Sequence, residues 1–236
     1  MRIEPYTIED FVHVYNRGNR KQPIVRDSND KWRFLQVLYY FNNEFSPANP
    51  LHALEDALKL DFNSRLVWPE NWPTHKPIVK IIAFALLENH FHLLLKEITE
   101  GGISKFMQKL GTGVTNRFNT KYHEVGRLFQ GSYKGRRVSK DIYFQYLSVY
   151  IQVKNIFELY PGGIQKAMEE FDKAYEWAVK YPYCSLADYA GNRNSPIIDK
   201  DILGEMFSKP EDYKEFARQC LLGMNLENKL GNLIIE

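Results

Sequence analysis

The stretch Leu86-Leu87-Glu88-Asn89-His90-Phe91-His92-Leu93-Leu94-Leu95-Lys96 contains two apolar runs separated by a polar pair. The first run begins at Val79 and is rich in Ile, Val, Phe and Leu, and the second, from His90 to Lys96, has the length of a strand. Two such runs joined by Glu88-Asn89 predict a hairpin of adjacent buried strands. The rest of the fold prediction is built around this hairpin.

Successive side chains of a strand point to opposite faces. His90 and His92 therefore share one face, while Phe91, Leu93 and Leu95 point the other way, into a core. The two histidines lie roughly 7 Å apart at Cα, close enough for both rings to bind one metal ion. Imidazole is the commonest metal ligand among side chains, but two histidines can also meet by chance. A metal site therefore needs a third ligand from elsewhere in the chain.

The segments on either side of the hairpin indicate the fold class. The predicted order is strand, helix, insertion, strand, strand, helix, strand and helix. These elements are expected at about residues 11–16, 31–41, 45–77, 79–87, 90–96, 102–118, 132–138 and 139–160. This order predicts an α+β protein with a ferredoxin-like antiparallel sheet and helices on one face. Three or four short helices after Pro161-Gly162-Gly163, the first over Ile164–Lys180, are expected to form a helical C-terminal extension.

The length of 236 residues suits one domain with appendages. Residues 1–160 are predicted to form the main domain and residues 161–236 the extension. Several prolines bracket a short amphipathic piece, Leu51–Leu60, inside the insertion at about 45–77. His52 and His75 lie in this insertion and are predicted to be non-functional.

Charge is distributed unevenly, although the formal net charge is only +2. Between Gly101 and Lys140 there are nine basic residues and one acidic residue, and from Tyr160 onwards there are nine basic and thirteen acidic residues. Such a run can be a plain solvated face, but here aromatic residues are interleaved with it, as is typical of single-stranded nucleic-acid binding. The side chains predicted to bind nucleic acid are Arg127, Lys134, Arg136 and Arg137 of this segment, together with Arg17 from the basic turn after the first strand.

Other classes of protein find no support in the sequence. Cys184 and Cys220 form neither a disulfide framework nor a metal-spaced motif. Residues 1–11 have no apolar signal-peptide core, and the longest apolar run, Ile81–Leu87, is too short to span a bilayer. We therefore expect a cytoplasmic protein without a membrane partner.

Five blocks, in order, resemble the REP-associated tyrosine transposases and the related single-tyrosine HUH transposases. Each is similar to a block of that family, namely "YNRGN", "MPNHVHLLL", "LWQGRYK", the start of "YIHLNPVRA" and "YPWSSY". The corresponding segments here begin at Tyr15, Leu87, Leu128, Tyr150 and Tyr181. Together they cover about residues 11 to 190.

The resemblance implies a metal-dependent enzyme that nicks single-stranded DNA and transfers strands through a 5′-phosphotyrosine, acting on hairpin-type repeat DNA. By position, His90 and His92 would bind Mg²⁺ or Mn²⁺, and Tyr150 would be the nucleophile. The implied partner is single-stranded or hairpin DNA. The resemblance leaves open whether the protein is a monomer or a dimer.

The chain departs from the family at the third metal ligand. In the family this ligand is Asn or Gln four residues after the tyrosine, whereas here that position is Lys154, whose ammonium has no lone pair. Gln152 and Asn155 are possible substitutes, although neither lies on quite the same face of an α-helix. Glu88, beside the histidines, is a further candidate. Lys154 is instead a possible helper that favours the phenolate of Tyr150.

Two alternatives to the enzyme are considered. The first is a domesticated relative that binds hairpin or single-stranded DNA with weak or no catalysis, which the Lys154 departure favours. The second is an unrelated metal hydrolase acting on small molecules, which would not need the basic segment between Gly101 and Lys140.

Overall fold

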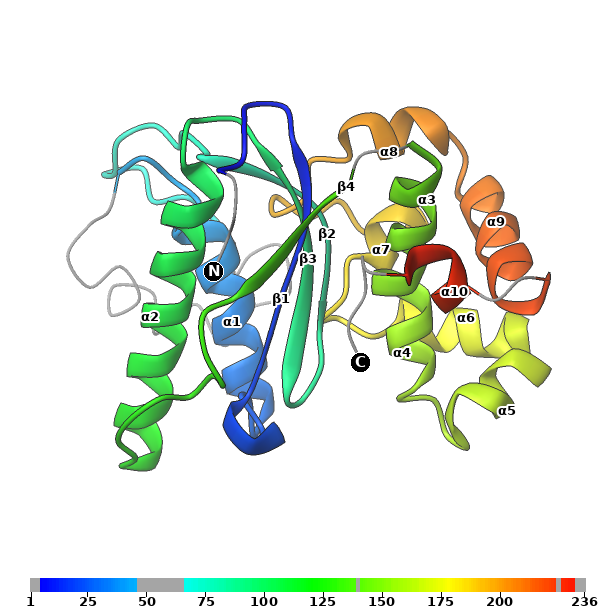
Figure 1. Ribbon diagram of the computed structural model, residues 1–236, viewed down its shortest axis with the longest axis horizontal. Coiled ribbons are helices and arrows are strands. Elements are labelled where there is room, and N and C mark those ends of the chain that lie inside the picture. The colour runs from blue at the N-terminus through cyan, green and yellow to red at the C-terminus, as the bar shows by residue number, and fades with distance from the viewer. Residues whose placement is uncertain (1–4, 46–65, 139–140, 224–225, 232–236) are drawn as a thin grey trace.

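The computed structural model describes residues 5–45, 66–138, 141–223 and 226–231. Within them, a four-stranded antiparallel sheet lies between two layers of helices (Figure 1). The predicted amphipathic piece Leu51–Leu60 and His52 lie outside the described residues.

The sheet has the ferredoxin-like strand order. Its strands are β1 (Phe11–Arg17), β2 (Val79–Leu86), β3 (His90–Glu97) and β4 (Lys134–Val138). They lie in the order β2-β3-β1-β4. Helix α1 (Ser28–Tyr40) connects β1 to β2, and helix α2 (Gly102–Tyr122) connects β3 to β4. This arrangement confirms the fold class expected from the sequence.

The hairpin forms as predicted. The Leu87 N–H donates to the His90 carbonyl at 2.9 Å, so Glu88 and Asn89 are the two residues of the turn between β2 and β3. The Gly18 N–H donates to the Asn89 carbonyl at 2.8 Å. The turn is therefore tied to the end of β1, where the polar residues of the first family-like block lie.

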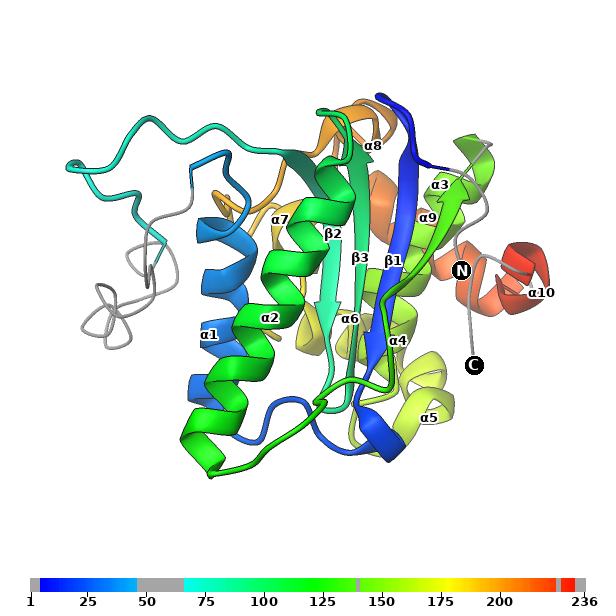
Figure 2. The ribbon, with the colours of Figure 1, turned by 60° about the vertical axis from the view of Figure 1, so that its left-hand side comes forward.

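Helices α1 and α2 cover one face of the sheet (Figure 2). Val14, Phe91 and Leu93 of the sheet belong to one buried cluster with Phe34 of α1 and Phe106 of α2. The side chains that alternate with them point to the opposite face, where a second buried cluster lies. Successive side chains of β1 and β3 face opposite clusters. The alternation therefore fixes which of these side chains lie on each face of the sheet.

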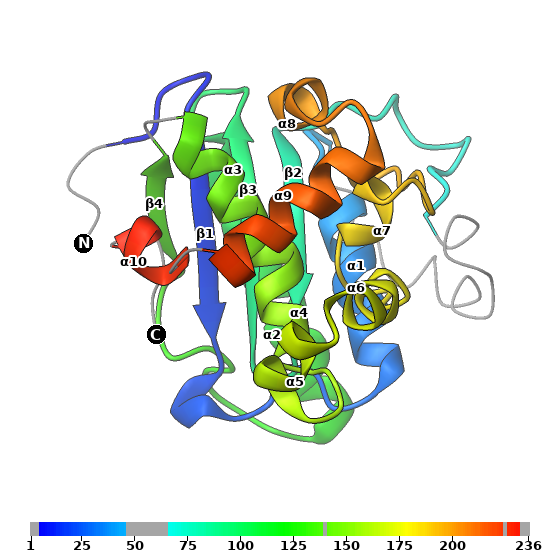
Figure 3. The same ribbon diagram turned by 90° about the vertical axis from the view of Figure 1, so that its right-hand side faces the viewer.

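The second face is covered by the chain that follows β4 (Figure 3). Helix α3 (Asp141–Val149), the π-helical turn η3 (Tyr150–Lys154) and α4 (Asn155–Phe157) run on without a break. The helices after them are α5 (Gly163–Glu169), α6 (Phe171–Val179), α7 (Leu186–Tyr189), α8 (Asp201–Met206), α9 (Pro210–Gly223) and α10 (Leu226–Leu230). Leu94 of the sheet shares one buried cluster with Leu147, Ala174 and Tyr213.

The structure differs from the predicted helices at one point of the extension. A single helix was expected over Ile164–Lys180, but Glu170 has φ −114° and ψ 43° and separates α5 from α6. Phe171, directly after this break, is buried in the second cluster. Among the described residues, no helix is both long and apolar enough to cross a membrane.

Candidate metal and nucleophile site

His90 and His92 lie on the face of the sheet that α3 and η3 cover. In the register of the sheet, His92 is opposite Tyr15 and His90 is opposite Arg17 of β1. The two imidazole rings are edge to face, with centroids 5.2 Å apart. His92 is 3% exposed and His90 is partly exposed. The predicted shared face of the histidine pair is thus present in the structure.

Each histidine of the pair is held at its Nδ1 atom. His90 Nδ1 is 2.6 Å from Asn89 Oδ1, and Asn89 Nδ2 donates to the Lys21 carbonyl at 3.2 Å. Because the amide nitrogen of Asn89 is used by Lys21, its oxygen faces His90 and accepts the Nδ1–H. His92 Nδ1 is 2.9 Å from Nε2 of His13. In both histidines, Nε2 is the ring nitrogen that these contacts do not use.

The surroundings keep both imidazoles neutral. Burial, with a smaller contribution from Arg17 and Lys154, lowers the pKa of His90 to about 4. Burial lowers the pKa of His92 well below its ordinary value, and His13 adds to this effect. A neutral imidazole is the form that binds a metal ion, so the pair is ready to do so at neutral pH.

Tyr150 meets the histidine pair from the covering helix. Its ring is perpendicular to that of His92, with centroids 5.6 Å apart, and it also lies 6.4 Å from the ring of His13. The two other tyrosines of this helical segment pack elsewhere: Tyr146 stacks on Phe216 at 5.8 Å, and Tyr143 packs against the second cluster.

The π-helical turn changes which residue lies one helical turn after Tyr150. The Asn155 N–H donates to the Tyr150 carbonyl, a spacing of five residues, whereas an α-helix uses four. Asn155 therefore takes the place that Lys154 would take in an α-helix. It is 2% exposed, and its Nδ2 has no hydrogen-bond partner in the described part of the chain. An amide in this position can turn its oxygen toward a cation.

The other candidate ligands are less well placed. The amide of Gln152 is already used, since its Nε2 donates to the Tyr213 hydroxyl at 2.9 Å and its Oε1 accepts from Ser185 at 2.8 Å. Lys154 Nζ lies 2.6 Å from a carboxylate oxygen of Glu158 and 5.3 Å from the Tyr150 ring centroid. Glu88 is exposed in the hairpin turn.

Within the described residues, no three His, Cys, Asp or Glu side chains are grouped to hold a metal ion. A donor set of two imidazoles completed by one amide oxygen fits a divalent ion and needs no acidic side chain.

The predicted DNA-binding side chains divide between the two faces of the sheet. On β4, Lys134 is opposite Tyr15 and Arg136 is opposite His13, so both lie on the histidine face, as does Arg17. Arg137 is opposite Val12 and forms an ion pair with Asp10 at 2.9 Å. Arg127 is exposed in the loop before β4.

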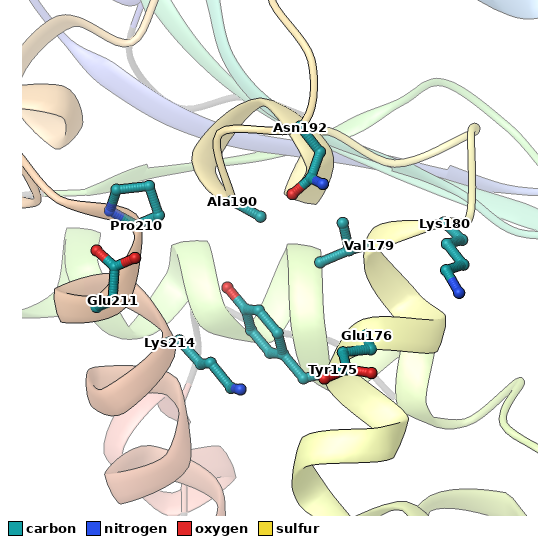
Figure 4. A pocket seen from close by; sticks show the side chains of 9 residues that line it. All are labelled: Tyr175, Glu176, Val179, Lys180, Ala190, Asn192, Pro210, Glu211 and Lys214. Carbon is teal, nitrogen blue, oxygen red and sulfur yellow. The ribbon is translucent and has the colours of Figure 1, made fainter.

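Two hollows lie outside the histidine site. One, of about 610 Å³, is lined by α2 and the loop that carries Arg127, and Asn16 and Phe91 of the other sheet face contribute to it. The second, of about 440 Å³, lies among helices of the extension, where Tyr175 extends between α6 and α9 (Figure 4). Neither hollow is lined by His90, His92 or Tyr150.

Sequence reasoning did not identify His13 and Tyr15 as members of the site. The Tyr15 ring lies 5.9 Å from the His92 ring, and its hydroxyl is buried without a hydrogen-bond partner among the described residues. Both residues alternate with Val12 and Val14 along β1. That alternation was visible in the sequence, but only the pairing register shows that their face is the histidine face.

Residues 74–154 match a protein-family model described as "Transposase IS200 like". This segment, about a third of the chain, is similar to the IS200-like transposases. It includes His90, His92 and Tyr150, and the similarity agrees with the resemblance of the ordered sequence blocks to a transposase family.

A solved structure described as "Structure of the REP associates tyrosine transposase bound to a REP hairpin" is similar over 84% of this chain and 88% of that chain. Its TM-score is 0.49 and its sequence identity is 10%. A comparison with curated proteins gives no match.

Proposed function

We propose that this protein is a metal-dependent transposase that nicks single-stranded or hairpin DNA and transfers the cut strand through a 5′-phosphotyrosine at Tyr150. The observation that carries the proposal is the meeting of Tyr150, from the covering helix, with the histidine pair on the hairpin. The match to the transposase family spans all three residues.

The chemistry assigned to Tyr150 is an in-line displacement at phosphorus. The Tyr150 hydroxyl loses its proton and its oxygen bonds to the scissile phosphorus, while the bond from phosphorus to the 3′ oxygen breaks. That oxygen takes up a proton and leaves as a 3′-hydroxyl, and the phosphate stays joined to the 5′ oxygen. A second 3′-hydroxyl can reverse the step and join a new strand. The phenol has an ordinary pKa near 10, so it needs activation.

The residues around Tyr150 supply the binding that this reaction needs. A divalent ion such as Mg²⁺ or Mn²⁺, bound through Nε2 of His90 and His92 and the amide of Asn155, would polarise a phosphoryl oxygen. The ammonium of Lys154, 5.3 Å from the Tyr150 ring centroid, favours a negative charge there. Arg17, Lys134 and Arg136 line the same face and neutralise phosphates of the bound strand.

The test is capture of the covalent intermediate. Single-stranded and hairpin DNA, labelled at the 3′ end, is incubated with the protein and Mn²⁺ and analysed on denaturing gels. We expect a labelled protein band for the wild type and for Tyr146→Phe, but none for Tyr150→Phe. Tyr146 is the matched control because it lies on the same helical segment yet stacks on Phe216.

Two outcomes would contradict the proposal. A band that persists in Tyr150→Phe would assign the nucleophile to another residue. Tight DNA binding with no band from the wild type would support the alternative function, a DNA-binding protein that does not cut. Both outcomes require that DNA binding is measured on the same preparations.

A further inference from the structure

The proposed function leaves one fully buried polar residue of the site without a role. His13 lies on β1, with none of its surface exposed, and faces the histidine pair. Its Nε2 is 2.9 Å from Nδ1 of His92, and the two rings stack with centroids 5.1 Å apart. Burying a polar ring is costly unless it is hydrogen-bonded. The contact with His92 is therefore a specific one.

A hydrogen bond between two imidazole nitrogens needs one N–H and one lone pair. In the first arrangement, His13 donates, and the proton of His92 then lies on Nε2. In the second, His92 donates from Nδ1, and its Nε2 carries the lone pair. Only the second arrangement allows His92 to bind a cation through Nε2 while its contact with His13 is kept.

We infer that His13 is a positioning residue, which holds His92 as the Nδ1–H tautomer and directs His92 Nε2 toward a divalent cation. The inference rests on the proposed function, because it assumes that the histidine pair binds a metal ion. Partners of this kind fix the orientation and tautomer of metal-binding histidines. Asn89 acts in the same way on His90, accepting its Nδ1–H at 2.6 Å.

The position of His13 in the sheet suits this role. β1 is an inner strand, paired with β3 on one side and β4 on the other. His13 is opposite Leu94 of β3 and Arg136 of β4. Both sides of its backbone are thus held in the sheet, and a side chain on such a strand is more rigid than one in a loop.

The first experiment measures the affinity of the full-length protein for Mn²⁺ by calorimetry. His13→Phe keeps the ring and removes the acceptor, so we expect binding about 10- to 100-fold weaker. His13→Gln places an amide oxygen near the position of Nε2 and should restore most of the affinity. His75→Phe is the control, since His75 packs against Tyr39 and Trp68 outside the site. Equal affinity of His13→Phe and wild type would overturn the inference.

The second experiment reads the tautomer directly and does not depend on a variant that folds. Long-range proton–nitrogen NMR correlations on the wild type loaded with Zn²⁺ should show the His92 proton on Nδ1 and the metal on Nε2. Metal bound through Nδ1 would overturn the inference.

A failure of the proposed function can be told apart from a failure of this inference. If the wild type binds neither Mn²⁺ nor Zn²⁺, the metal site of the proposed function is wrong. The same NMR measurement on the metal-free protein then decides the role of His13. A His92 proton on Nδ1 would support the hydrogen bond inferred here, and a proton on Nε2 would overturn it.

Discussion

Single side chains of the site owe their properties to neighbours on adjacent strands. His90 is neutral because it is partly buried and because the cationic Arg17 lies opposite it on β1. His92 is neutral because it is buried against His13. A positively charged surrounding also favours an incoming phosphate, so the features that keep the imidazoles neutral would also serve the proposed DNA binding.

The low pKa of His90 predicts how stability depends on pH. The unfolded state takes up a proton near pH 6.5, whereas the folded state does so only near pH 4. The free energy of unfolding should therefore fall as the pH falls from about 6.5 toward 4 and level off below that range. Between pH 7 and pH 5, His90 should account for a loss of about 2 kcal/mol.

This loss can be measured by urea unfolding of the metal-free protein at pH 7 and pH 5. His90→Gln removes the titrating group, so its loss of stability should be smaller than that of the wild type. The same loss in both proteins would show that His90 has an ordinary pKa in the folded state.

Arg136 and Arg137 form a matched pair of adjacent basic residues with different surroundings. Arg136 is on the histidine face, whereas Arg137 is on the other face and is bound by Asp10 and by the Pro5 carbonyl. For single-stranded DNA, Arg136→Ala should flatten the slope of log affinity against log salt by about 0.7, the value of one phosphate contact. Arg137→Ala should change the slope less.

Fluorescence anisotropy titrations at several salt concentrations measure these slopes. If Arg137→Ala flattens the slope and Arg136→Ala does not, the DNA lies against the α1–α2 side of the sheet.

At the scale of elements, the π-helical turn η3 decides how the helix that carries Tyr150 meets the sheet. Its extra residue places Asn155 one turn after Tyr150, and π turns inside helices are frequent at functional sites. The same turn directs Gln152 toward the extension, where it bonds Tyr213 of α9 and Ser185. The helix that carries Tyr150 is thereby fastened to the C-terminal helices of its own chain.

Tyr213→Phe tests this fastening. The Tyr213 hydroxyl accepts from Gln152 and donates to Ser148 at 3.3 Å, and all three residues are buried. Its removal leaves a buried amide N–H unpaired, so the free energy of unfolding should fall by about 1–3 kcal/mol.

Tyr175→Phe is the matched control in the same layer, because the buried Tyr175 hydroxyl has no partner within the described residues. Its substitution should change stability by about 0.5 kcal/mol or less. Both values come from urea unfolding, and equal losses would mean that the bond to Gln152 contributes no net stability.

For the whole molecule, the extension and the sheet share one buried cluster. Ala83 and Leu94 of the sheet lie in the cluster that also contains Ala174 of α6 and Ala217 of α9. The Ser185 N–H donates to the Phe84 carbonyl at 3.0 Å, which joins the extension to the outer edge of β2. The boundary predicted near residue 160 therefore does not separate two independent cores. That the proposed catalytic domain ends near residue 160 stays a prediction.

The shared cluster predicts one cooperative unfolding transition. In scanning calorimetry, the calorimetric and van't Hoff enthalpies should agree, because neither part can lose its packing without exposing the other. Two resolved transitions, or a calorimetric enthalpy well above the van't Hoff value, would show that the extension unfolds separately.

The sequence alone was sufficient for the hairpin, for the strand and helix order and for the shared face of His90 and His92. These follow from local rules, since the period of two along a strand decides the face of each side chain whatever the strand pairs with. The ordered blocks around Tyr15, His90 and Tyr150 were also enough to indicate a resemblance to a transposase family, which the match over residues 74–154 supports. Local patterns could not show the break at Glu170 or the π turn at Tyr150, because both depend on packing against the second cluster.

Only the tertiary structure brought His13 and Tyr15 to the histidine pair, because a strand's partners and register depend on contacts between residues far apart in sequence. It also showed that Asn155, and not Lys154, lies one helical turn beyond Tyr150. It showed as well that Arg136 and Arg137 lie on opposite faces of the sheet. In each case the side chain was visible in the sequence, but its neighbours were not. The chemistry of a buried imidazole, amide or guanidinium is decided by those neighbours.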